Sequence, residues 1–129
     1  MSKTRTQEEV EKFLKDMKMK LSDPNGLVIV KEHKPGDKTN NFMIMKGLNN
    51  ELVKEELLKL DILNYSYTDY DRDPPFQGEE LWFFGQMYDR AEVYIKLKLR
   101  TKVICLSFHE KDYDIRYPYL NGWWRFKVN

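Results

Sequence analysis

Tyr94 and His109 are the two side chains whose types and spacing are best suited to chemistry. An unperturbed imidazole titrates near pH ~6.5, so a histidine can accept or donate a proton at physiological pH. A tyrosine can hydrogen-bond a phosphate or stack on a base. Three cations, Lys96, Lys98 and Arg100, follow the tyrosine at alternate positions. Metal-free cleavage of RNA needs a base for the 2′-hydroxyl, a cation for the phosphate and an acid for the leaving oxygen, and these residue types fit those roles.

Two adjacent runs of alternating polarity position these side chains. Apolar residues take every second place from Glu92 to Arg100, and they alternate again from Val103 to His109. Period-2 alternation is typical of a strand with one face on a core. Only Thr101 and Lys102 separate the runs. The sequence therefore predicts an antiparallel hairpin with strands over about 92–100 and 103–109.

The hairpin also predicts a register. A two-residue loop opposes apolar residues on one face: Leu99 with Ile104, Leu97 with Leu106, and Ile95 with Phe108. On the other face it opposes Lys98 with Cys105, Lys96 with Ser107, and Tyr94 with His109. A three-residue loop would turn the apolar row of one strand to the wrong face. One face is thus expected to be a core seam and the other a cationic, titratable surface.

The composition indicates one domain, 1–129, because 129 residues (15.6 kDa) can bury a core without disulfides or metals. The single cysteine, Cys105, cannot form an internal disulfide, which is typical of a reducing compartment. The sequence has neither an apolar run of about 18 residues nor a signal peptide at its start. We therefore expect a cytoplasmic location and no membrane partner.

Charge is distributed unevenly along the chain. The net charge of +1 does not by itself indicate a nucleic-acid binder. Basic residues predominate between Arg90 and Lys102, however, and acidic residues predominate between Thr68 and Glu80. A nearly neutral chain can therefore carry a basic face beside an acidic loop.

Two helices and a further strand are predicted around the hairpin. A capping-box pattern at Thr6 and Glu9, followed by apolar residues at helical spacing, predicts a helix over 7–21. Asn49 or Asn50 can cap a second helix that runs to about residue 60 or 63. A third central strand is predicted over 80–88. The resulting fold class is α+β, with two helices packed on a mainly antiparallel sheet.

The remaining segments indicate a second hairpin and a long loop. Leu27–Val30 and Asn41–Met45 are short apolar runs, and residues 33–40 between them are typical of an exposed hairpin loop. Two consecutive prolines and mixed charge predict an irregular loop from about residue 68 to 78. Loops of this length are often functional or mobile.

The tail, Glu110–Asn129, is rich in aromatic residues and carries the interleaved cations Arg116, Arg125 and Lys127. Such a segment can stack on and pair with nucleic acid. The alternative is that its rings cover the end of the sheet, because burial is the commoner use of aromatic side chains.

Sequence motifs of the common cofactor and metal sites do not occur. The chain has no phosphate-binding loop, dinucleotide fingerprint, nucleophile elbow or cysteine–histidine metal spacing. We therefore expect no cofactor and no metal ligand. The residues alone leave an ordinary explanation open for Tyr94 and His109, which is a cross-strand pair on a wet face.

Five short stretches carry a resemblance to a known family: Phe13-Leu14-Lys15-Asp16-Met17-Lys18, Leu81-Trp82-Phe83-Phe84-Gly85, Val93-Tyr94-Ile95-Lys96-Leu97, Val103-Ile104-Cys105-Leu106-Ser107-Phe108-His109 and Tyr117-Pro118. Together they resemble the bacterial motility quorum-sensing regulator toxins (MqsR-like). That family belongs to the RelE-type ribonuclease superfamily of type II toxin–antitoxin systems. The resemblance covers roughly residues 10–119, and its most specific parts are the Tyr-Ile-Lys and Ser-Phe-His stretches.

The resemblance implies a small RelE-like α+β fold with helices on one side of a curved antiparallel sheet. It also implies metal-independent cleavage of mRNA and neutralisation by an antitoxin. It places functional residues at Tyr94 and, just after Ser-Phe, at His109, where the family usually has a lysine. Better-known members carry an upstream lysine and glutamine, in whose neighbourhoods this chain has Asn64-Tyr65-Ser66 and Leu81-Trp82.

Three functional hypotheses follow. The first is a toxin, an mRNA interferase that inhibits translation, with catalytic Tyr94 and His109 and RNA-binding Lys96, Lys98 and Arg100. Its expected partners are RNA, on or off the ribosome, and a cognate antitoxin such as a helix-turn-helix protein. The second is a non-catalytic RNA- or ribosome-binding module that uses the same basic face. The third is a protein-interaction domain in which this face and the Trp123-Trp124 tail dock a partner.

Overall fold

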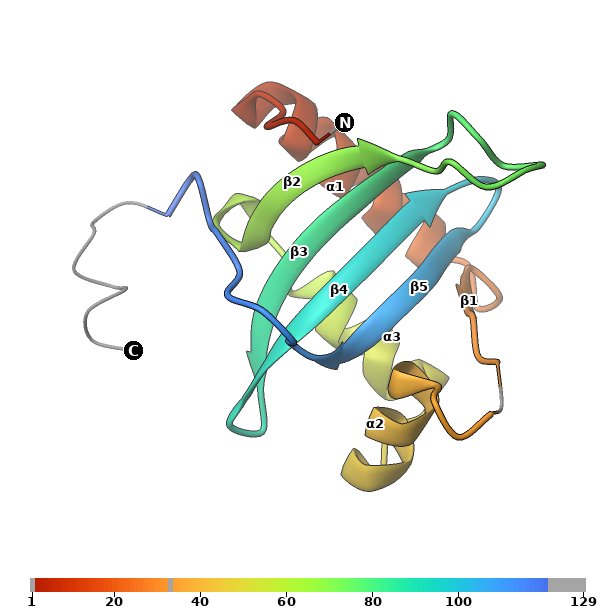
Figure 1. The fold of residues 1–129 in the computed structure, drawn as a ribbon. Helices are drawn as coiled ribbons and strands as arrows, with labels where there is room; N and C mark the ends of the chain where they lie inside the picture. Colours follow the sequence, from red (N-terminus) through yellow and green to blue (C-terminus); the bar gives the residue numbers. More distant parts are fainter. Residues whose placement is uncertain (1, 33, 121–129) are drawn as a thin grey trace.

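Three helices lie against one face of a five-stranded sheet within residues 2–32 and 34–120, which the computed structural model describes (Figure 1). In chain order the elements are α1 (Gln7–Leu21), β1 (Leu27–Ile29), α2 (Lys38–Lys46), α3 (Asn50–Leu58), the 3-10 turn η1 (Ile62–Asn64), β2 (Tyr65–Tyr70), β3 (Glu80–Tyr88), β4 (Ala91–Leu99) and β5 (Val103–Glu110). This arrangement confirms the α+β class, although the described residues hold three helices where the sequence predicts two.

The sheet has the order β1-β5-β4-β3-β2. β2 to β5 form an antiparallel meander, and β1 runs parallel to β5 at one edge. The three central strands predicted over 80–88, 92–100 and 103–109 are confirmed to within one residue at each end. No helix in the described part of the chain is long and apolar enough to cross a membrane.

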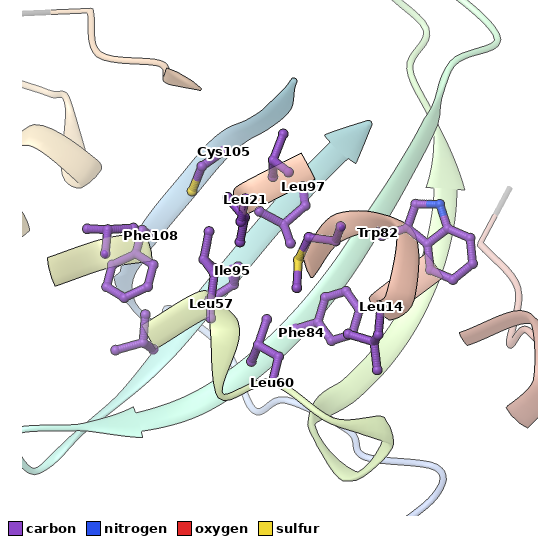
Figure 2. Packing of buried hydrophobic residues seen from close by; sticks show 14 of the residues in the cluster. Leu14, Leu21, Leu57, Leu60, Trp82, Phe84, Ile95, Leu97, Cys105 and Phe108 are labelled. Atoms are coloured by element: carbon purple, nitrogen blue, oxygen red, sulfur yellow. The ribbon is translucent and has the colours of Figure 1, made fainter. Parts of the chain in front are cut away.

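The two predicted helices form on the core side of the sheet. α1 has the predicted capping box, and its buried residues Val10, Phe13, Leu14, Met17 and Leu21 recur at helical spacing. Phe13 stacks on Trp82 of β3 with ring centroids 4.2 Å apart. Figure 2 shows Trp82 in the core cluster, together with Leu14 of α1. α3 is capped by Asn49, whose side chain accepts a hydrogen bond from the Leu52 amide. Because the helices cover this face, the opposite face of the sheet is left for other contacts.

Residues 41–45 are helical, so the predicted hairpin between Leu27–Val30 and Asn41–Met45 is wrong. Asp37 caps α2 by accepting a hydrogen bond from the Asn40 amide at 3.0 Å, and Gly47 ends the helix with a φ of 66°. The buried residues of α2 are Thr39, Phe42 and Met43, which is the spacing of one helical face. A short apolar run does not distinguish strand from helix, and here the two caps decide.

β2 occupies Tyr65–Tyr70, so the predicted loop over 68–78 begins too early. Thr68, Asp69 and Tyr70 pair with β3, and the irregular connection is residues 71–79. The signal for this strand lies in its tyrosines and threonine, which favour a pleated, half-buried surface.

The register of β4 with β5 is as predicted at one end and wrong at the other. Tyr94–His109, Ile95–Phe108 and Lys96–Ser107 are confirmed, whereas the observed pairs are Leu97–Cys105, Lys98–Ile104 and Leu99–Val103 instead of Leu97–Leu106, Lys98–Cys105 and Leu99–Ile104. The loop between these strands has three residues, 100–102, which shifts the phase by one. A bulge that leaves Leu106 unpaired then restores the predicted pairing register from Lys96–Ser107 onward.

Val103 and Cys105 consequently take the core positions that the sequence assigns to Ile104 and Leu106. Both are fully buried. Burial raises the pKa of the Cys105 thiol to about 12, so the sulfur stays protonated at physiological pH. Cys105 lies opposite Leu97 and not, as predicted, opposite a lysine.

Candidate functional site

Tyr94 and His109 lie side by side on the face of the sheet opposite the helices. Tyr94 is in the middle of β4 and pairs with His109 near the end of β5. Their ring centroids are 5.4 Å apart, with an interplanar angle of 39°. Val93 and Ile95, on either side of Tyr94, are fully buried in the core. Strand alternation therefore turns Tyr94 outward.

Two further rings extend this pair into a row that crosses four strands. Tyr67 of β2 stacks on Phe83 of β3, with centroids 4.2 Å apart and an interplanar angle of 9°. Phe83 and Tyr94 are 5.8 Å apart, and the Lys96 ammonium lies 5.8 Å from the centroid of Phe83. We call Tyr67, Phe83, Tyr94 and His109 the ring row. The ring row and the adjacent Lys96 together place an imidazole, two phenols and a cation on one surface.

A pocket of about 460 Å³ lies over the ring row. The chain after β5 folds back across the sheet and forms its second wall (Figure 1). Apart from the ring row, the lining residues are Ser66, Phe84, Asp112, Tyr113, Asp114, Ile115 and Arg116. We call this hollow the ring pocket. Its size falls in the usual range of small-ligand sites.

Glu92 and Gly85 hold the second wall in place. The Tyr117 hydroxyl donates a hydrogen bond to the Glu92 carboxylate at 2.6 Å, and the Lys111 ammonium pairs with the same carboxylate at 2.8 Å. At Gly85 of β3, a Cβ would lie 2.2 Å from the Tyr117 hydroxyl oxygen. The close approach of the tail to the sheet therefore requires glycine at this position.

The described part of the tail packs on the sheet at one place and lines the ring pocket at another. Tyr119 covers the sheet as the burial alternative predicts, because it stacks on Tyr65 at 6.1 Å and donates a hydrogen bond to the Arg5 carbonyl. Arg116 lines the ring pocket. Trp123, Trp124, Arg125 and Lys127 lie outside the described residues.

One nitrogen of His109 is committed to a backbone contact. His109 Nδ1 lies 2.8 Å from the carbonyl oxygen of Glu110. A carbonyl oxygen can only accept a hydrogen bond, so Nδ1 carries the proton in this contact. Nε2 of the neutral ring then carries the lone pair. This tautomer is the one needed for a base that works through Nε2.

Tyr94 and Tyr67 keep their protons. Burial is the main cause that raises the pKa of the Tyr94 hydroxyl, and the neighbouring Tyr67 raises it further. Burial also raises the pKa of Tyr67. Both side chains therefore act as neutral hydroxyls that can donate or accept a hydrogen bond.

Lys98 and Arg100 are occupied by carboxylates of the loop 71–79. The Lys98 ammonium lies 2.7 Å from Asp71 and 2.8 Å from Glu79, and its side chain is only 3% exposed. Arg100 binds Glu79 through two nitrogens, at 2.7 and 3.1 Å. The ring of Phe76 lies 5.0 Å from the Lys98 ammonium and 4.2 Å from the Arg100 guanidinium. We call these five residues the acidic clamp.

The two carboxylates of the acidic clamp stay ionised well below neutral pH. Hydrogen bonds from Arg100 and then Lys98 lower the pKa of Glu79 to about 2. The hydrogen bond from Lys98 is the main cause that lowers the pKa of Asp71. The clamp therefore carries paired charges throughout the physiological range.

The structure thus separates the residues that the sequence predicts as one site. Tyr94 and His109 lie in the ring pocket, and Lys96 lies beside it over Phe83. Lys98 and Arg100 lie further along the same face, inside the acidic clamp. The basic face beside an acidic loop, which the charge pattern predicts, is present as a set of direct ion pairs.

Sequence reasoning missed Tyr67 and Phe83 as members of the site. Phe83 belongs to a run of apolar residues, Leu81–Phe84, whose faces cannot be told apart by polarity. Tyr67 follows Tyr65 at the spacing of one strand face, but the bulge between them turns Tyr67 to the other side. The bulge leaves no mark in the sequence.

No group of three or more histidine, cysteine, aspartate or glutamate side chains is arranged to hold a metal ion among the residues that the structure describes. In comparisons with known proteins, no family model, curated protein or solved structure matches the chain. The site must therefore be interpreted from its own geometry.

Proposed function

We propose that this chain is a metal-independent endoribonuclease that cleaves mRNA and inhibits translation, as the toxin of a type II toxin–antitoxin system. The observation that carries the proposal is His109 in the ring pocket, with Nδ1 bonded to a carbonyl and with Tyr94 beside it. Lys96 and Arg116 supply positive charge at the pocket. These groups suit a reaction at a phosphodiester.

Cleavage would proceed by attack of the 2′-hydroxyl on the adjacent phosphorus. Nε2 of His109 accepts the 2′-hydroxyl proton, the new bond joins the 2′ oxygen to phosphorus, and the bond from phosphorus to the 5′ oxygen breaks. The leaving oxygen takes a proton from water. Tyr94 donates a hydrogen bond to a phosphate oxygen, and Lys96 offsets the charge that develops there. The products are a 2′,3′-cyclic phosphate and a 5′-hydroxyl.

Single-stranded RNA is the substrate that suits the ring row. Unpaired bases stack on aromatic side chains, whereas the bases of a duplex are already stacked on one another. Tyr67 and Tyr94 are partly exposed in the pocket and can contact a base or a ribose. In a cytoplasmic toxin the same pocket would be the surface that a cognate antitoxin has to block, whether that partner is a helix-turn-helix protein or another type.

The test compares wild type with His109→Ala on an end-labelled, unstructured oligoribonucleotide in the presence of a metal chelator. We expect cleavage by the variant to be at least ~100-fold slower, which is the usual contribution of a general acid or base. Thr101→Ala, at the exposed tip of the β4–β5 turn, is the matched control and should cleave at the wild-type rate. Mass analysis of the fragments should find the cyclic phosphate.

Expression in cells completes the test. Wild type should arrest growth, His109→Ala should not, and a co-expressed antitoxin encoded by a neighbouring gene should restore growth. The proposal fails if the purified protein leaves RNA intact and His109→Ala does not relieve the arrest.

A non-catalytic RNA- or ribosome-binding module is the second candidate. The observation that favours it is that the ring row holds one imidazole and two phenols that keep their protons. No second side chain of the ring row is therefore suited to donate the proton that the leaving 5′ oxygen needs. This function predicts salt-sensitive binding of single-stranded RNA without any change in length of the RNA.

A further inference from the structure

The acidic clamp lies on a continuation of the surface that the proposed function uses. Tyr94, Lys96 and Lys98 alternate along β4, and Arg100 follows in the turn. Alternate residues of a strand share a face and are ~6.8 Å apart. A single strand of RNA that leaves the ring pocket past Lys96 would meet Lys98 and Arg100 next.

The loop 71–79 gives these two cations the contacts that a nucleotide would give. Glu79 and Asp71 present carboxylate oxygens at 2.7 to 2.8 Å, where phosphate oxygens would bind. The Phe76 ring lies 4.2 Å from the Arg100 guanidinium, where a base would stack. One loop therefore supplies both an anion and a flat ring to one pair of cations.

The loop is closed on itself and contacts this end of β4 through a few side chains. Its neck has backbone hydrogen bonds from the Asp71 amide to the Glu79 carbonyl and from the Gly78 amide to the Asp71 carbonyl, each 2.8 Å long. Residues 72–78 are exposed. Asp71 and Glu79 stand at this neck, so their side chains can turn away from Lys98 and Arg100, and the exposed part of the loop with them, without unpairing β2 from β3.

We propose that residues 71–79 are a lid that occupies a second nucleotide subsite, formed by Lys98 and Arg100, and that single-stranded RNA displaces it. The proposal rests on RNA binding by the ring pocket. In the closed state carboxylates neutralise the two cations, which therefore neutralise no phosphate and displace no counterions from the RNA. In the open state they bind one phosphate and stack one base next to the nucleotide in the ring pocket. Affinity for RNA is thereby held down until a strand long enough to reach both subsites is present.

Glu79→Gln in the full-length protein tests the lid, because Glu79 contacts both cations. The probe is a fluorescein-labelled single-stranded oligonucleotide with 2′-O-methyl riboses, which cannot be cleaved through the 2′ position. Binding is followed by fluorescence anisotropy over a series of potassium chloride concentrations. We expect binding several-fold tighter than wild type at low salt. The slope of log affinity against log salt should become steeper by about 0.7, the value for one phosphate of a single strand.

Asp73→Asn is the matched control. It removes the same charge from the same exposed loop, and Asp73 is not a member of the acidic clamp. Its affinity for the probe, and the slope of log affinity against log salt, should equal those of wild type. Thermal melting checks that both variants fold. Phe76→Ala provides a second test that leaves all three ion pairs of the acidic clamp in place, and it should tighten binding by less than Glu79→Gln.

The outcomes separate the lid from the nuclease. If Glu79→Gln and Phe76→Ala bind the probe no better than Asp73→Asn, the clamp is only structural and the lid is overturned, whatever the cleavage assay shows. If Glu79→Gln binds better while unmodified RNA stays intact, the lid stands and the nuclease is lost. If no variant binds the probe, the lid is overturned, and the cleavage assay alone decides the nuclease.

Discussion

The ring pocket and the acidic clamp share one face of one sheet but differ in what covers them. At Tyr94 the sheet surface borders a pocket of about 460 Å³ between the ring row and the tail. Further along β4 on the same face, the Lys98 side chain is 3% exposed, because the carboxylates of Asp71 and Glu79 cover it. The strand that carries both residues is regular at both places. The difference comes from the segments that pack on the sheet from elsewhere in the chain. The tail leaves a hollow over Tyr94, whereas the β2–β3 loop covers Lys98 directly.

This difference shows what strand alternation does and does not determine. Alternation puts Tyr94, Lys96 and Lys98 on one face, whatever the rest of the chain does. The availability of each side chain depends on long-range partners such as Asp71 and Glu79, which are 27 and 19 residues away from Lys98 in sequence. A charge pattern can show that such partners exist, but it does not show which cation they reach.

The largest expected effect on stability is at Lys98. Lys98→Met keeps the aliphatic stem but leaves Asp71 and Glu79 close together without the ammonium between them. Removing one member of a buried ion pair costs ~3–5 kcal/mol, and the partial exposure of the two carboxylates lets water enter and reduces that cost. We expect a loss of about 2 kcal/mol in the free energy of unfolding, measured by urea denaturation.

Lys96→Met is the control, since it makes the same change on the same face two residues earlier. Lys96 is partly exposed, and its ammonium lies 5.8 Å from the centroid of the Phe83 ring, with a weak electrostatic interaction with Asp71 besides. Its replacement should change stability by less than ~0.5 kcal/mol. Equal losses for the two variants would contradict the distinction between the two ends of the face.

The same contrast explains which parts of the site could be predicted from the sequence. The pairing of Tyr94 with His109 was predictable, but for an incomplete reason. The three-residue loop and the bulge at Leu106 each shift the pairing register of β4 with β5 by one residue. Beyond the bulge the two shifts cancel. Between the loop and the bulge they do not cancel, so the pairs of Leu97, Lys98 and Leu99 were wrong.

The fold class was predictable because the long elements are strongly periodic, as in α1 and β4. α2 was not, because its nine residues give the same short apolar run that a strand would give. Its caps, Asp37 and Gly47, are visible in the sequence and were the better signal. Tyr67 and Phe83, the other two members of the ring row, were out of reach, since their place depends on a bulge in β2 and on stacking across strands.

A smaller effect is expected at Gly85, which tests the wall of the ring pocket. In Gly85→Ala the new methyl group would meet the Tyr117 hydroxyl and must push the tail from the sheet. The hydrogen bond from Tyr117 to Glu92 would then be lost. We expect a loss of about 1–2 kcal/mol in unfolding free energy, the usual range for overpacking and for a lost charged hydrogen bond.

Gly36→Ala is the matched control for this substitution. A Cβ at Gly36 has nothing within 4 Å, and so the change should be nearly neutral. A second check is the double variant Gly85→Ala/Tyr117→Ala. If the methyl group acts through Tyr117, the double variant should be no less stable than Tyr117→Ala alone. Additive losses would place the cause of the destabilisation elsewhere.

The smallest effects expected are pH-dependent, and they have opposite signs at the two ends of the face. At the acidic clamp, the pKa of Glu79 is lowered from 4.5 to about 2 in the folded protein. Its ionised form therefore contributes stability that is present above about pH 4.5 and is lost as the pH falls towards about 2. Urea unfolding at a series of pH values should show wild type more stable than Glu79→Gln at neutral pH, with the difference shrinking over this acid range.

At the ring pocket the change occurs in alkali. The pKa of Tyr94 is raised above its ordinary value of 10.0, so above that pH the unfolded chain releases a proton that the folded chain keeps. Wild type should therefore lose stability relative to Tyr94→Phe as the pH rises beyond about 10. The difference in unfolding free energy between wild type and Glu79→Gln should not change in this range. If instead Tyr94→Phe follows wild type throughout the alkaline range, the Tyr94 hydroxyl is open to solvent. Burial would then not be what keeps Tyr94 a neutral hydroxyl in the ring pocket.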